Sequence, residues 1–171
     1  DSSGKVNLEY DLAPSEKCVQ NDRFSELGLT LRDAAIASTR VDWSGLGPLT
    51  SVPGKSKMNV AGTWAMHKDD YRFAGNRAGV EWVSVGGNGG SEVFVLESGT
   101  HNVSFENVDG HICLTENMAV AGYGGKASDP SGLKSAGDIA MKGGFRFYIA
   151  RVPAGRADVA PDLTYTFHYG F

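Results

Sequence analysis

The chain has 171 residues, of which 41% are hydrophobic and 21% charged, and its formal net charge is -4. This length and balance predict one folded domain with a sizeable core and exclude a disordered chain. The absence of a basic block argues against nucleic acid as a partner. No run approaches the 18 apolar residues that membrane insertion would need.

The first stretch, residues 4–12, alternates strictly between apolar and polar side chains. Its apolar positions are Val6, Leu8, Tyr10 and Leu12, and the residues between them are polar or charged. Period-two alternation predicts a strand with one buried face, and Pro14 ends it because proline cannot donate to a ladder. Such a strand needs an apolar groove, which belongs either to this chain or to a neighbouring copy.

Short apolar segments separated by glycine clusters fill the rest of the sequence. The segment 24–36 fits a strand or a helix, and Gly28 favours the strand because glycine costs a helix about 1 kcal/mol. Gly86 to Gly90 predicts a hairpin-type break. The other expected strands are residues 36–43 (closed by a turn over 44–48), 58–66, 79–85, 93–97, 102–108, 112–115 and 144–152.

The C-terminal end mirrors the N-terminal one. Its alternating apolar positions are Leu163, Tyr165, Phe167, Tyr169 and Phe171. Ten or so short strands at regular spacing, without a convincing long helix, predict an all-β sandwich. We expect residues 1–13 to form an N-terminal extension and residues 14–171 a single β-sandwich domain.

Residues that could carry chemistry do not gather into a recognisable site. The histidines His67, His101, His111 and His168 lack metal spacing, and we expect them to be solvated or structural. Neither a catalytic constellation nor a cofactor motif is apparent, so we expect no enzyme, metal or cofactor. A ligand contact remains possible at three tryptophans, Trp43, Trp64 and Trp82, whose rings could stack on a sugar. A tryptophan on a strand is more often packed in the core.

The two cysteines, Cys18 and Cys113, are too far apart for a zinc or redox motif. A disulfide between them would imply an oxidising compartment. The alternative is a pair of separate buried thiols.

The two ends together resemble subunits of chaperone–usher pili. The N-terminal resemblance rests on Gly4, Val6, Leu8, Tyr10 and Leu12 followed by Cys18, and the C-terminal one on Gly155 and the strand containing Tyr169. In this chain Tyr169 is third from the end, and Cys113 lies further from the first cysteine than the family pattern has it.

The resemblance implies an immunoglobulin-like fold that lacks its last strand and is completed by a donor strand from a neighbouring subunit. It further implies a periplasmic chaperone and an outer-membrane usher as partners, and a place on the bacterial surface. Residues 163–171 would form part of the groove and the edge that the chaperone captures.

Three hypotheses follow in order of preference. The first is a pilus subunit that polymerises head-to-tail by donor-strand exchange and mediates or supports adhesion. The second is a secreted or tip-located β-sandwich that binds a host glycan or protein receptor. The third, an enzyme assembled from distant residues, has the least support in the sequence.

Overall fold

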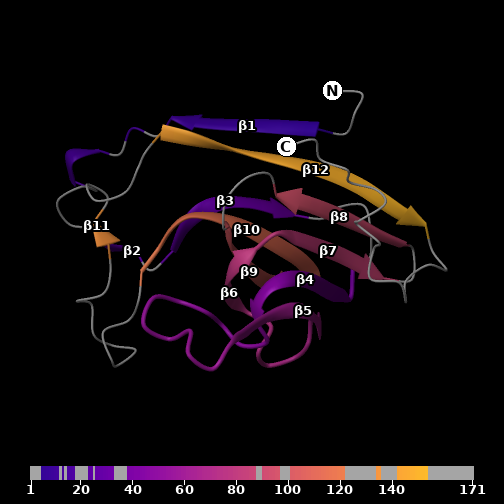
Figure 1. Ribbon diagram of the computed structural model, residues 1–171. Helices are drawn as coiled ribbons and strands as arrows, with labels where there is room; N and C mark the ends of the chain where they lie inside the picture. Colours follow the sequence, from indigo (N-terminus) through magenta and orange to yellow (C-terminus); the bar gives the residue numbers. More distant parts are fainter. Residues whose placement is uncertain are drawn as a thin grey trace.

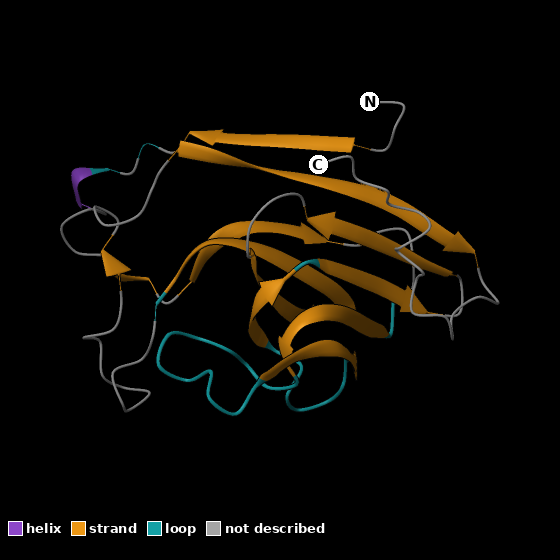
Figure 2. Ribbon diagram, viewed as in Figure 1, coloured by secondary structure: helices purple, strands orange, loops and turns teal. Residues whose placement is uncertain are grey.

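The structure is a computed structural model of the chain, and it describes residues 5–11, 13, 15–17, 23–24, 26–32, 38–87, 90–96, 101–121, 134–135 and 142–153. These residues are predominantly β-strand, arranged in two antiparallel sheets, as an all-β sandwich requires (Figures 1 and 2). Among them no helix is long and apolar enough to cross a membrane.

The larger sheet has six strands. Their order across the sheet is β1 (Lys5–Asp11), β12 (Lys142–Pro153), β8 (Gly90–Leu96), β7 (Trp82–Gly87), β4 (Arg40–Gly47) and β5 (Val60–His67). Figure 1 shows β1 lying along the long strand β12 at one edge of the molecule. The first described element of the chain is therefore paired with the last.

The second sheet has four strands, in the order β3 (Glu26–Arg32), β10 (His111–Val120), β9 (His101–Val108) and β6 (Gly75–Val80). A small two-stranded sheet pairs β11 (Lys134–Ser135) with β2 (Arg23–Phe24). The β9–β10 hairpin turns through Asp109 and Gly110, which both have positive φ. This is the geometry of the two-residue turns that best match strand twist.

Most predicted strands are confirmed, with β10 running past the expected end at residue 115 to Val120, and two further expectations are wrong. The expected strand 79–85 is divided at Glu81, and its two parts lie in different sheets, as β6 and β7. Glu81 marks the crossing, because its N–H donates to the Ser44 carbonyl while its own carbonyl accepts from Leu96. The second error is the turn expected over residues 44–48, since β4 continues to Gly47.

Glycines allow β4 to continue where a turn was expected. Gly45 lies so near β6 that an added Cβ would be 3.1 Å from the Gly79 carbonyl oxygen. At Gly47 a Cβ would be 2.6 Å from the Trp64 ring. These glycines are therefore positions of close approach within the sandwich rather than turn residues.

The core between the sheets is built from side chains of both. Trp43 of β4 contacts Phe105 of β9 edge-on, with ring centroids 5.3 Å apart, and Phe73 lies 6.0 Å from the same ring. The remaining buried members are Val41, Met66, Val80, Val83, Val85, Val103, Ile112 and Leu114. Both sheets thus share one apolar interior.

A buried arginine lies inside this core. The guanidinium carbon of Arg77 lies 5.2 Å from the Trp43 ring and 5.4 Å from the Phe105 ring. Its nitrogens donate to the carbonyls of Arg72 at 2.8 Å and Gly75 at 3.0 Å. Burial lowers the pKa of Arg77 to about 10, against a smaller opposing effect of the Glu26 charge. The cation therefore secures the chain entering β6 from inside the core.

Replacing this arginine should destabilise the fold. Arg77→Met removes two short charge-assisted hydrogen bonds and leaves buried carbonyls without a donor, while relieving the cost of burying a cation. We expect a loss of about 2–4 kcal/mol in the free energy of unfolding, measured in urea. Arg40→Met, at a half-exposed side chain paired with Asp42, is the matched control and should cost about 0–1 kcal/mol. Equal losses in the two variants would contradict the role of Arg77.

The loop after β5 contains a bidentate ion pair. Arg72 donates to both carboxylate oxygens of Asp70, at 2.9 and 2.7 Å. Together with the Arg72 backbone N–H, these hydrogen bonds lower the pKa of Asp70 from its ordinary 3.8 to about 2. Because the folded-state pKa is depressed, the pair contributes stability above pH 3.8 and loses it as the pH falls through about 2.

The Asp70 titration can be followed by carboxyl NMR. In Arg72→Gln the midpoint should rise from about 2 towards 3.8. Lys57→Gln removes the same charge from another exposed loop and should leave the Asp70 midpoint in place. A midpoint that stays low in Arg72→Gln would show that other groups hold the carboxylate charged.

Candidate functional site: the groove beneath the N-terminal strand

The alternating N-terminal stretch forms β1 and keeps the predicted alternation. Val6, Leu8 and Tyr10 are partly buried, whereas Asn7 and Glu9 between them are exposed. Because successive side chains of a strand point to opposite faces, β1 directs one apolar face inward. Leu12, the fourth predicted member of this face, lies outside the described residues.

β1 belongs to the chain's own sheet. It pairs antiparallel with β12 from Lys5 opposite Tyr148 to Asp11 opposite Lys142. On its other side β12 pairs with β8, whereas β1 has no second neighbour among the strands that the structure describes. Of the two alternatives, a groove of its own or one of a neighbour, the single chain uses its own.

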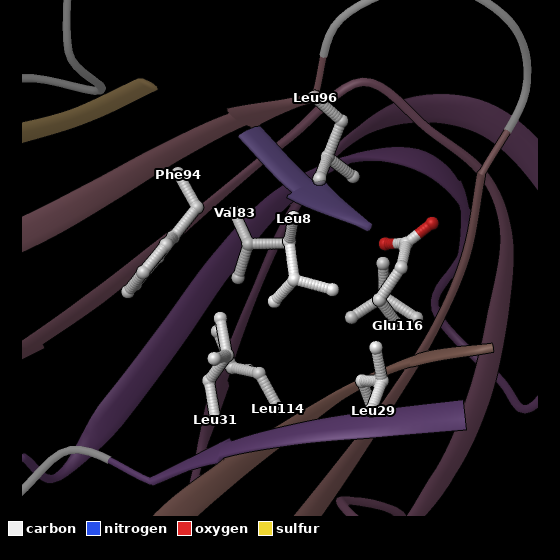
Figure 3. A pocket seen from close by; sticks show the side chains of 9 residues that line it. Leu8, Leu29, Leu31, Val83, Phe94, Leu96, Leu114 and Glu116 are labelled. Atoms are coloured by element: carbon white, nitrogen blue, oxygen red, sulfur yellow. The ribbon is translucent and has the colours of Figure 1, made fainter. Parts of the chain in front are cut away.

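An apolar groove lies beneath β1, between the two sheets (Figure 3). The six-stranded sheet contributes Val83, Phe94 and Leu96, and β1 contributes Leu8. The four-stranded sheet contributes Leu29, Leu31, Val103, Leu114 and Glu116. The cavity that remains beside Leu8 has a volume of about 30 Å³, so Leu8 covers the groove and leaves a small space unfilled.

Among the described residues that line the groove, Glu116 has the one polar side chain. Its Oε1 lies 2.6 Å from Nδ1 of His101, and the two side chains are only 12% and 11% exposed. Its Oε2 is buried and has no hydrogen-bond partner. The predicted structural role of His101 fits this buried pair, but the carboxyl group in the groove was not foreseen. The available signal was Glu116 itself, since it interrupts the inward apolar positions Ile112 and Leu114 by falling on their face.

Polar side chains also gather away from the groove. Asn117 Nδ2 donates to Ser104 Oγ at 2.8 Å and to Asn76 Oδ1 at 3.0 Å, and Ser104 also bonds Glu26. These groups join β3, β10, β9 and β6 by hydrogen bonds among themselves. The network has a structural role, because its members bond chiefly to one another across four strands; Asn117 Oδ1 is its one buried atom without a partner among the described residues.

Two of the three tryptophans considered for sugar stacking are packed in or against the core of the sandwich. Trp43 is fully buried in the core, so its proposed ligand contact is wrong. Trp64 packs partly buried against that core, and its indole N–H donates to the Gly45 carbonyl at 3.2 Å. Trp82 is partly buried on β7. These rings are packed inside because a large aromatic side chain on a strand stabilises the fold most when it is buried in the core.

Several of the predicted site residues lie outside the described residues. Cys113 is a free, buried thiol on β10, which gives no support to the bridge with Cys18; that partner lies outside the described residues. The whole C-terminal set Leu163, Tyr165, Phe167, Tyr169 and Phe171 lies outside them as well. Within the described part of the chain, no group of three or more acidic, histidine or cysteine side chains could hold a metal ion.

No protein-family model matches this chain, and no curated protein is significantly similar to it.

The contact between Leu8 and the groove should contribute measurably to the free energy of unfolding of the single chain. Leu8→Ala removes partly buried apolar surface from the groove, so we expect a loss of about 1–2 kcal/mol in the free energy of unfolding. Asn7→Ala, on the exposed face of the same strand, should change it by less than about 0.5 kcal/mol. Indistinguishable unfolding curves for the two variants would mean that β1 is not held on the groove.

Proposed function

We propose that this protein is a structural subunit of a surface pilus of the chaperone–usher type, polymerising head-to-tail by donor-strand exchange. The observation that carries the proposal is β1 itself, an alternating strand that pairs, among the described strands, with β12 alone and lays one apolar face on an inter-sheet groove. The resemblance of the sequence at both ends supports the same function.

β1 is suited to exchange because, in the part of the chain that the structure describes, it pairs with a neighbouring strand on one side only. Removing it frees the edge of β12 and uncovers the apolar groove, but leaves every other strand pair of both sheets intact. The same strand from a second copy could then make the same contacts in trans. Joining copies in this heterologous way gives a filament instead of a closed ring.

β1 can cover the groove of its own chain or that of a second copy, and the free energies of these two arrangements differ little. Assembly conditions therefore decide between them. Full burial of Val6, Leu8 and Tyr10 would contribute on the order of 5–9 kcal/mol, and their partial burial contributes less. Because an exchanged strand makes contacts of the same kind, the net gain of a trans strand over a cis strand is small. A chaperone that holds the groove open before assembly would therefore decide the outcome, which fits the proposed periplasmic route to the bacterial surface.

In this proposal the sandwich is immunoglobulin-like and lacks its last strand. Adhesion to a host glycan or protein receptor would be mediated or supported by the assembled fibre. A free-standing or tip-located binding sandwich is the weaker alternative, because Trp43 is unavailable for stacking and Trp64 packs against the core.

An unheated SDS gel of the non-reduced protein tests the proposal. The full chain should give a ladder of heat-sensitive multimers, and a chain lacking residues 1–13 should give none. Because the truncated chain could fail to fold, Leu8→Asp and Asn7→Asp add the same charge to opposite faces of β1. Leu8→Asp should abolish the ladder and Asn7→Asp should keep it.

The opposite result is equally informative. A single monomer band for the full chain, together with an unfolded truncated chain, would mean that β1 only completes its own sheet. The pilus function would then be rejected in favour of the binding sandwich.

A further inference from the structure

The unpartnered carboxyl oxygen in the groove bears on which residue of an incoming strand belongs there. Glu116 Oε2 is buried with no hydrogen-bond partner, in a wall whose other described residues are apolar. The side chain that β1 lays over this groove is Leu8, which has no donor to offer (Figure 3). A buried acceptor left in this state favours an occupant that brings an O–H or N–H.

The N-terminal strand has one such group on its apolar face. Among Val6, Leu8, Tyr10 and Leu12, only Tyr10 has a side-chain donor. A shift of two residues keeps this face turned inward, because side chains alternate with period two. It would place Tyr10 where Leu8 lies, Leu8 where Val6 lies, and Leu12 where Tyr10 lies.

Within one chain, β1 is covalently joined to β2 and β3 by residues 12–22, and it pairs with β12 in the unshifted register. A strand from a second copy pairs with β12 without that connection. The longer tyrosine side chain would also occupy space that Leu8 leaves empty.

We infer that, in the polymer, the incoming strand of a second copy lies two residues out of the register seen within one chain, with its Tyr10 hydroxyl donating to Glu116 Oε2. Glu116 is then the residue of the groove that fixes the register. This inference rests on the proposed function. It adds two details to that function. They are the register of the incoming strand on β12 and the hydrogen bond between Tyr10 and Glu116 that selects this register.

Cysteine pairs on the exposed face report the register without touching the groove. Within one chain Asn7 lies opposite Arg146, and after the shift Glu9 would lie opposite Arg146; all three residues are exposed. Chains with Arg146→Cys are therefore mixed with chains with Glu9→Cys or Asn7→Cys, allowed to assemble, and oxidised. Peptide mass spectrometry then identifies the bridged residues.

We expect the Glu9→Cys mixture to give at least a tenfold higher yield of intermolecular bridges than the Asn7→Cys mixture. A single chain with both Asn7→Cys and Arg146→Cys should close an internal bridge, which checks the register of the monomer. Multimers bridged mainly through Asn7→Cys would overturn the inference and leave the proposed function standing. The absence of any multimer would overturn both.

A second measurement addresses the hydrogen bond itself. Tyr10→Phe should lower the temperature at which multimers dissociate on the gel, because the donor is lost. In a Glu116→Leu background the same change should have no effect, since the acceptor is gone. Equal lowering in both backgrounds would overturn the pairing of Tyr10 with Glu116.

Discussion

The apolar gap between the two sheets has to be covered along one side, and β1 is the strand that covers it. The core around Trp43 and Phe105 fills the gap in one region, where Arg77 stacks against both rings. Near β1 the gap is a groove with Leu8 lying over it. The space between the sheets is therefore tightly packed around Trp43 and Phe105 and incompletely filled near β1. β1 lies over the incompletely filled part.

Strict alternation made much of the fold predictable. β1 keeps the burial pattern that residues 5–11 indicate, and β8, β9 and β12 fall where short apolar runs between glycines place them. β6 was missed because its buried positions include Asn76 and Arg77, which do not look apolar in a sequence. Such residues are stabilised by partners distant in the chain, and local periodicity carries no information about those partners.

The groove was predictable in kind but not in detail. Alternation at the N-terminus indicates that an apolar groove exists, but Leu29, Leu31, Phe94 and Leu96 come from strands whose neighbours only the topology determines. The turn at Asp109 and Gly110 had a readable signal, since this dipeptide between apolar runs is a strong hairpin marker. Glu116 had a weaker one, as a single charged residue on an inward face.

The pairing of β1 with β12 also has a consequence for biosynthesis. Lys5 faces Tyr148 and Asp11 faces Lys142, so the earliest described element waits for the latest one before it can pair. Contacts this distant in sequence form slowly, because a long loop has to close first. During that interval the rest of both sheets can assemble from closer strands, while the N-terminal strand is still without its place. The strands that form the walls of the groove, β3 and β7 to β10, are therefore synthesised before β12, the strand with which β1 pairs.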